Sequence, residues 1–389
     1  MSKTFAVLKK YSMAIILFLV IWLFYVLTDK TILLPQNINN LIAQNAYVLI
    51  LAVGMLLCIL TGGNIDLAVG SVVCFVGAVG GTMMDKHINT PAAVITMLIV
   101  GILIGLWQGF WIAYVNVPPF IATLSGMYAF RGLSNVVLQG LTLSITDTGF
   151  VSTFGGGADC YVPDMFSSMN APINLTCMLA AVVGVIIYIG LTIKSYVVSK
   201  KNGYETEPIV GTVIKVVVIS AITLWFAYKL SCYKGIPTSL VWIVIVVGVY
   251  GYITNKTTIG RDLYALGGNK KAASLSGIDI KKVLFFSYVN MGLLAALAGI
   301  LTIARAVTAN PTSAQGYEMD AIGACFIGGA SAYGGIGTVP GVIIGAVLMG
   351  VINQGMSIMG IDANAQKMVK GGVLLLAVII DVLSKKENK

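Results

Sequence analysis

Charged side chains are scarce in this chain, and this scarcity already limits which class of protein it can be. Only 10% of the 389 residues are Asp, Glu, Lys or Arg, whereas 58% are hydrophobic and the mean hydropathy is +0.92. A soluble domain usually carries about 25% charged residues. The composition therefore excludes an ordinary soluble protein and predicts an integral membrane protein.

Motifs for nucleotide, metal and nucleophilic chemistry are also lacking. The sequence has no GxxxxGK[ST] loop, a single histidine (His87), and six cysteines without CxxC or other metal-ligand spacing. No Ser/His/Asp constellation is visible. We therefore expect no enzymatic activity in this chain and no bound cofactor or metal. Cys160 and Cys232 fall in expected outer loops, and the sequence leaves open whether they pair.

Long apolar runs, by contrast, recur from end to end. A helix needs about 20 apolar residues to cross a bilayer core, and candidate runs lie at 12–28, 41–61, 66–84, 92–115, 118–138, 173–193, 211–230, 239–254, 283–304, 319–333, 338–360 and 366–383. The run at 319–333 is short and rich in glycine, which predicts a re-entrant or broken helix. The expected fold is an all-α polytopic membrane protein with about 10–12 transmembrane helices in a single domain, 1–389.

Positive charges predict how the chain is oriented. Most of the 24 Lys and Arg residues fall on one side if both termini are cytoplasmic, as expected for a protein of the cytoplasmic membrane. The first run could be a cleaved signal peptide, but it is long and ends without a small-residue cleavage pattern, which favours a retained span. The net charge of +9 is explained by orientation and contact with anionic lipid, without a nucleic-acid partner.

One cytoplasmic loop, 256–282, is unusually basic and is patterned like a short helix. Six positive residues lie in it: Lys256, Arg261, Lys270, Lys271, Lys281 and Lys282. An ordinary basic loop would only set the orientation of the protein. A loop patterned in this way also predicts a shaped surface for a cytoplasmic partner.

A faint inverted repeat relates the two halves of the chain. Residues 64–70 lead to the glycine block 101–105, and residues 318–323 lead to a similar block at 341–345. Under the predicted orientation the corresponding segments run in opposite directions, as in many transporters with glycine-broken helices. Small residues also recur in membrane helices simply because they allow close packing.

Polar residues within the spans are candidates for a substrate pathway, because each is costly unless it faces protein or water. Amides among small residues suit a neutral, polyhydroxylated solute better than an ion, although for any single residue interhelical packing is the favoured role. No chain of buried carboxylates of the kind used by proton-coupled carriers is visible. The candidates are Asn64, Asp66, Gln108, Thr123, Arg131, Asn290, Asp320 and Asn353.

Four separated blocks resemble, in order, the ribose-type permease family of bacterial ABC importers. The first is GGNIDLAVGS at 62–71, and the second is PPFIATL at 118–124 followed by Arg131-Gly. The third is IGRDLYALGGNKKAASLSGI at 259–278. The fourth begins at Pro311-Thr and continues with GYEMDAI at 316–322, IGGA at 327–330 and GGIG at 334–337.

This resemblance implies the ABC importer permease fold and a set of partners. Two copies of the chain would line a pathway, separate ATPase subunits would bind and hydrolyse ATP in the cytoplasm, and an extracytoplasmic binding protein would deliver sugar. The basic loop would be the coupling helix, with an apolar face of Ala265, Leu266, Ala272, Ala273 and Leu275. The residues implied in coupling are Gly267, Gly268, Asn269, Lys270, Lys271, Ala272, Ala273, Ser276 and Gly277.

An insertion at about 195–255, with a polar loop and an extra hydrophobic pair, is absent from the shorter ribose permeases. Longer members with such an insertion resemble the xylose and multiple-monosaccharide permeases, which favours xylose, galactose, arabinose or a similar sugar as cargo. Two alternatives stay open: an ABC permease for a nucleoside or other small polar solute, and a secondary sugar carrier.

Overall fold

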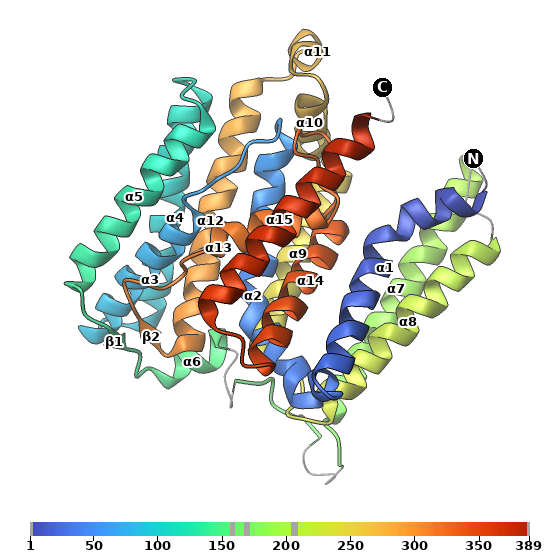
Figure 1. Ribbon diagram of the computed structural model, residues 1–389, viewed down its shortest axis with the longest axis horizontal. Helices are drawn as coiled ribbons and strands as arrows, with labels where there is room; N and C mark the ends of the chain where they lie inside the picture. Colours follow the sequence, from blue (N-terminus) through green and yellow to red (C-terminus); the bar gives the residue numbers. More distant parts are fainter. Residues whose placement is uncertain (1–2, 156–159, 167–171, 204–208, 387–389) are drawn as a thin grey trace. The chain divides into compact units, whose positions relative to one another are not determined.

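The computed structural model describes residues 3–155, 160–166, 172–203 and 209–386. Every predicted apolar run coincides with one helix (Figure 1). The all-α polytopic membrane fold is thereby confirmed; part of the expected polar loop, 204–208, lies outside the described residues. The helices are α1 (Lys3–Leu27), α2 (Pro35–Leu60), α3 (Val69–Asp85), α4 (Thr90–Ala113), α5 (Pro119–Leu138), α7 (Leu175–Lys201), α8 (Ile209–Ser231), α9 (Thr238–Lys256), α12 (Ile280–Ala306), α13 (Tyr317–Ile327), α14 (Val339–Ile358) and α15 (Ala363–Lys386).

The remaining elements are short. A 3-10 turn, η1 (Thr31–Leu33), precedes α2, and α6 (Thr148–Phe154) follows strand β1 (Leu143–Ser144). β1 pairs antiparallel with β2 (Thr308–Ala309), with Leu143 opposite Ala309 and Ser144 opposite Thr308. This pairing joins the chain that follows α5 to the chain that follows α12.

Local sequence signals explain several helix ends. Asp279 and Thr338 cap α12 and α14, because their side chains accept hydrogen bonds from backbone amides of the first turn. Pro119 stands in the first turn of α5, where its missing amide has no helical partner to lose. α12 ends where Val307 adopts a left-handed conformation with φ 55°.

Helix length separates full spans from partial ones. Among the described residues, seven helices (α2, α4, α7, α8, α9, α12 and α14) are long and apolar enough to cross a membrane, and shorter apolar stretches lie at Met13–Leu27 and Val69–Asp85. α13 has 11 residues, which corresponds to about 16 Å against a hydrocarbon core of about 30 Å. α13 therefore cannot cross alone, in line with the broken helix expected at 319–333.

Contacts divide the chain into two compact units. Unit 1 holds Met1–Ile32, Leu41–Cys160 and Thr238–Lys389, and unit 2 holds Leu33–Asn40 and Tyr161–Pro237. In unit 2, α7 packs against α8, and the side chain of Asn174 caps α7. The insertion expected at 195–255 overlaps unit 2, and its bounds stay a prediction.

The centre of unit 1 depends on very close helix crossings. α12 packs along α4, and a Cβ on Gly292 would lie 2.3 Å from the carbonyl oxygen of Gly101. In the second half, a Cβ on Gly345 of α14 would lie 2.1 Å from the carbonyl oxygen of Ala324 in α13. Both glycine blocks thus sit where backbones touch, as small residues do in membrane bundles. An inverted relation between the halves stays a prediction.

Candidate functional site

The basic loop at 256–282 folds into a helical hairpin, named here by its two helices α10 (Thr258–Gly268) and α11 (Lys270–Leu275). The backbone is extended at Asn269, with φ −159° and ψ 104°, and this breaks the helix. The Asn269 side chain then accepts a hydrogen bond from the Ala272 amide at 3.1 Å and caps α11. Within unit 1, α11 projects beyond the ends of the long helices (Figure 1).

The outer surface of the hairpin is basic with a small apolar patch. Lys270 and Lys271 are exposed, as are Gly268 and Ser276, and Leu275 is 90% exposed. Leu266 and Ala273, expected on the same apolar face, are instead buried against the protein. The exposed apolar patch therefore comprises Ala265, Ala272 and Leu275.

The hairpin leads into α12 through a sharp, capped turn. Gly277 has φ 84°, a left-handed conformation that favours glycine, and no atom lies within 4 Å of where its Cβ would be. Asp279 accepts hydrogen bonds from the Lys281 and Lys282 amides at 3.1 and 3.2 Å, and the Lys282 ammonium lies 3.3 Å from its carboxylate. The backbone hydrogen bond from Lys282 is the main reason that the pKa of Asp279 lies below its ordinary value.

The inner side of the hairpin is anchored to backbone atoms from distant parts of the chain. A Cβ on Gly267 would lie 1.8 Å from the carbonyl oxygen of Leu60 and 2.3 Å from the amide nitrogen of Gly335. The Tyr264 hydroxyl donates a hydrogen bond to the Gly337 carbonyl at 2.7 Å. Because these contacts leave no free space, a displacement of α10 must also move the segments that it touches.

Those segments are two glycine-rich turns that also touch each other. The first, 61–68, joins α2 to α3, and the second, 328–338, joins α13 to α14. The Gly335 amide donates to the Leu60 carbonyl at 3.1 Å, and a Cβ on Gly63 would lie 2.0 Å from the Ala332 carbonyl oxygen. The hairpin and both turns thus form one continuous set of backbone contacts.

Two of the candidate pathway residues, Asn64 and Asp66, lie in the first turn. The Asn64 amide nitrogen donates to the Thr61 hydroxyl at 3.0 Å. Asp66 is buried and accepts a hydrogen bond from the Ala68 amide at 2.8 Å. Both side chains therefore hold the shape of the turn itself.

Four further candidates lie within helices that the sequence predicted as spans. Thr123 donates to the Pro119 carbonyl of its own helix, and Asn290 accepts a hydrogen bond from the Tyr250 hydroxyl at 2.7 Å. Gln108 is buried, and within the part of the chain that the structure describes its Nε2 has no hydrogen-bond partner. The same is true of the Asn353 Oδ1.

The last two candidates, Asp320 and Arg131, hold the segment at the start of α13. Asp320 is 1% exposed and holds the Lys370 ammonium at 3.0 Å, while the Tyr47 hydroxyl donates to its other oxygen at 2.7 Å. This buried group joins α2, α13 and α15. Arg131 of α5 donates to the Ser313 carbonyl at 2.6 Å, and so fixes the loop that precedes α13.

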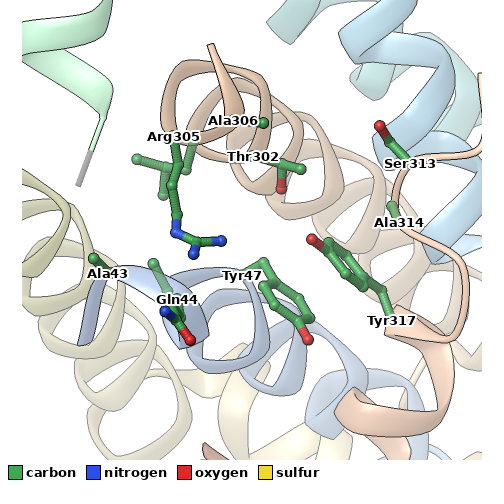
Figure 2. Close-up of a pocket in the computed structure, with 11 residues that line it drawn as sticks. Ala43, Gln44, Tyr47, Thr302, Arg305, Ala306, Ser313, Ala314 and Tyr317 are labelled. Atoms are coloured by element: carbon green, nitrogen blue, oxygen red, sulfur yellow. The ribbon is translucent and has the colours of Figure 1, made fainter. Parts of the chain in front are cut away.

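Tyr47 of the first group and Ser313 of the second both line a cavity of about 140 Å³ inside unit 1, shown in Figure 2. The Arg305 guanidinium extends from the last turn of α12 into this space, with Gln44 and Tyr47 opposite it on α2. The Tyr47 and Tyr317 rings are stacked, with centroids 3.4 Å apart. The rest of the lining consists of Ala43, Ala46, Leu301, Thr302, Ala306, Ser313 and Ala314.

Sequence reasoning missed the residues that line this cavity. Arg305 was not among the candidates, although an arginine at the end of a long apolar run is a usable signal. Tyr317 lies inside the block 316–322, where Asp320 was the one candidate. Gln44 and Tyr47 lie one helical turn apart within an apolar run, and nothing in that run indicates which helix they face.

Comparison with known proteins agrees with the pattern of blocks. A family described as "branched-chain amino acid transport system / permease component" matches residues 37–378. The xylose transport system permease protein of Haemophilus influenzae is 35% identical over 98% of this chain and 98% of its own length. The corresponding xylose protein of Escherichia coli K12 is 33% identical over 93% of this chain and 88% of its own length. The ribose import permease protein of the same strain is 34% identical over 89% of this chain and 85% of its own length.

No solved structure matches the chain. The family match covers far more than half of the residues, and the similarity to the xylose permeases is continuous across both halves. The chain therefore belongs to the ribose/xylose-type family of ABC importer permeases, which are multi-pass proteins of the inner membrane.

Proposed function

We propose that this permease imports a monosaccharide such as xylose, galactose or arabinose. The observation that carries the proposal is the match to a xylose permease over 98% of both chains. A match of that extent leaves no unmatched segment large enough to build a different pathway. The polar cavity and the absence of carboxylates among its lining residues suit a neutral solute.

The α10–α11 hairpin would receive the energy of ATP from separate ATPase subunits in the cytoplasm. Its exposed tip offers two lysines beside the Ala265, Ala272 and Leu275 patch, which suits a partner cleft with an apolar floor and an acidic rim. Its root touches both glycine-rich turns. ATP would be bound and hydrolysed only by the partner, so this chain would need no cofactor.

Transport would then follow as a population shift between inward-open and outward-open states. Closure of the ATPase pair would move the hairpin, and the close contacts at Gly267 would pass that motion to the two turns. A second copy of the chain would form the other half of the pathway, and an extracytoplasmic sugar-binding protein would deliver the cargo. The apolar outer faces of the helices would contact membrane lipid.

The hairpin and both termini would lie in the cytoplasm. Within unit 1 the beginning of α1 and the end of α15 lie on the same side as α11 (Figure 1). The exposed lysines of the hairpin favour the cytoplasmic face, where positive charge is retained. The terminal lysines that supported this orientation in the sequence belong to side chains outside the described residues.

Reconstitution tests this function directly. The permease, co-purified with its ATPase and incorporated into proteoliposomes, should take up radiolabelled xylose, galactose or arabinose when binding protein and ATP are both supplied. Uptake of nucleosides but of no sugar would contradict the proposed cargo. Sugar uptake driven by a proton gradient without ATP would contradict the proposed mechanism.

A charge-reversal variant tests the role of the hairpin. Lys270→Glu with Lys271→Glu should abolish ATP-driven uptake while the protein still reaches the membrane, because both side chains are exposed on the outer surface of the hairpin. The matched control is Lys86→Glu, an exposed lysine at the end of α3. Normal uptake by the double variant would show that the hairpin is not the coupling surface.

A further inference from the structure

We propose that the cavity of Figure 2 is a sugar-binding subsite in which the Arg305 guanidinium holds two neighbouring hydroxyl groups of a monosaccharide ring. This assignment rests on the proposed function and adds to it the place in the permease where the cargo is bound. None of the residues that make up the cavity's polar wall was among the candidates expected from the sequence.

The Arg305 side chain is the central feature of the cavity. It makes no ion pair or hydrogen bond with any residue that the structure describes, and it points into the space between Gln44 and the tyrosines (Figure 2). A guanidinium presents five N–H donors in a fixed plane. Two adjacent hydroxyls of a sugar match that spacing, so the donors that lack protein partners would be satisfied by the ligand.

The opposite wall is rigid. The stacked rings of Tyr47 and Tyr317 offer apolar surface to the C–H groups of a sugar, and the Tyr47 hydroxyl is held by Asp320, which is itself paired with Lys370. The Gln44 amide adds both a donor and an acceptor. A sugar hydroxyl can act in both senses, so it can pair with either end of the Gln44 amide.

Charge and size both favour a neutral ring. Arg305 lies in the last turn of α12, where the helix dipole places partial negative charge that offsets the guanidinium and weakens the attraction for anions. No Asp or Glu lines the cavity, so cations are disfavoured as well. An engineered cavity of about 150 Å³ accepts a benzene ring, so the 140 Å³ cavity here has room for a six-membered ring, with the hydroxyls that Arg305 does not hold directed to its open side.

Position in the fold agrees with a cargo site. Arg305 is 25 residues beyond Ile280, the first residue of α12 and the end nearest the hairpin, which places it about 38 Å away along the helix. The cavity is therefore remote from the coupling surface and lies toward the end of α12 that would face the binding protein. α2 and α12 each contribute to the cavity and each lead directly to the contacts around the hairpin.

Cysteine protection tests the subsite. The complete transporter would carry Ser313→Cys with Cys232→Ser, because the Ser313 side chain lines the cavity without a part in holding the sugar, and Cys232 is the one exposed cysteine among those described. Reaction with a charged maleimide should slow when D-xylose, D-galactose, L-arabinose or D-ribose is added, whichever the complex imports. The matched control, Lys86→Cys in the same background, should react at the same rate with and without sugar.

A second variant tests the guanidinium itself. Adding Arg305→Gln should raise the sugar concentration needed for half-protection by at least about tenfold, because hydrogen bonds from a charged donor are lost. The thermal stability should stay unchanged, since no described residue depends on Arg305. An unchanged half-protection concentration would overturn the role of Arg305.

The remaining outcomes separate the possible failures. Protection by inorganic phosphate and by no sugar would overturn the proposal in favour of an anion site. Wild-type import of a sugar that gives no protection would overturn the subsite and leave the proposed function standing. Failure of the wild-type complex to import any monosaccharide would overturn the proposed function itself.

Discussion

Replacement of Gly267 by alanine should uncouple the hairpin from the rest of the permease. The added Cβ would lie 1.8 Å from the Leu60 carbonyl oxygen, whereas ordinary contacts begin at 3.4 Å, so the neighbours must separate by about 1.6 Å. Both colliding groups, the Leu60 carbonyl and the Gly335 amide, are backbone atoms. No side-chain rotation can therefore relieve the clash.

The magnitude follows from two effects. Overpacking of this kind costs about 1–3 kcal/mol, and separating α10 from α2 also weakens the 3.1 Å hydrogen bond between the Gly335 amide and the Leu60 carbonyl, worth about 1 kcal/mol. We expect a loss of about 2–4 kcal/mol in local stability. The hairpin should be displaced and ATP hydrolysis should continue without sugar uptake.

The neighbouring glycine provides the control. Gly268→Ala should be tolerated, because no atom lies within 4 Å of its Cβ position and its φ is not in the left-handed region. The assay compares ATP-driven uptake, ATPase activity and thermal unfolding of both variants in proteoliposomes and detergent. Wild-type uptake by the Gly267→Ala transporter, or equal damage from both substitutions, would refute the close contact.

Three further perturbations test other parts of the structure. Gly277→Arg should reduce uptake without loss of the protein from the membrane, because the side chain has open space but must adopt a left-handed conformation that costs about 1–2 kcal/mol; normal uptake would contradict this. Asp320→Asn should lower the free energy of unfolding by about 3 kcal/mol, because it leaves the Lys370 ammonium without its partner. Adding Lys370→Met should recover most of that stability in a thermal unfolding experiment. If the double variant stays as unstable as Asp320→Asn, the loss does not come from the unpaired lysine. The pKa of Asp279 lies below its ordinary value of 3.8, so its cap stabilises α12 above pH 3.8 and is lost as the pH falls further. The hydrogen-exchange protection factor at the start of α12, taken relative to the intrinsic exchange rate at each pH, should fall with acidification in the wild type and lose that dependence in Asp279→Asn.

Much of the fold was predictable because the membrane imposes a strong local rule. Every apolar run became a helix, since backbone groups in hydrocarbon must be paired within the segment. The weak run at 319–333 contains only the 11-residue α13, because glycines at 328 and 329 stop the helix early. The positions of these helices depend on the length and composition of each run, and both can be read from the sequence.

The shape of the hairpin was less predictable. The sequence predicted a short helix with one apolar face that included Leu266 and Ala273. The Asn269 side chain caps a second helix and changes its direction, so those two side chains turn inward. An asparagine between two short helical stretches could have indicated the bend.

The cavity could not be predicted because its residues come from α2, α12 and the start of α13. Their approach depends on how the helices cross, and the crossings depend on glycines whose partners are far apart in the chain. The candidate polar residues show the same limit: Asn290 pairs with Tyr250 on α9, and Asp320 pairs with Lys370 on α15. Polarity within a span indicated that a partner exists but not which one.

The crossing of α4 and α12 has a mechanical consequence. Gly292 lies near the middle of the stretch where the two backbones touch, 12 residues after Ile280 and 14 before Ala306, which gives arms of about 18 and 21 Å. If α12 tilts as a rigid helix about this contact, its two ends move in opposite directions. A tilt that moves the hairpin end inward would therefore move Arg305 outward by a similar amount. The glycines that let α12 approach α4 would thereby give the permease a pivot, with opposite motions at its two faces from a single push.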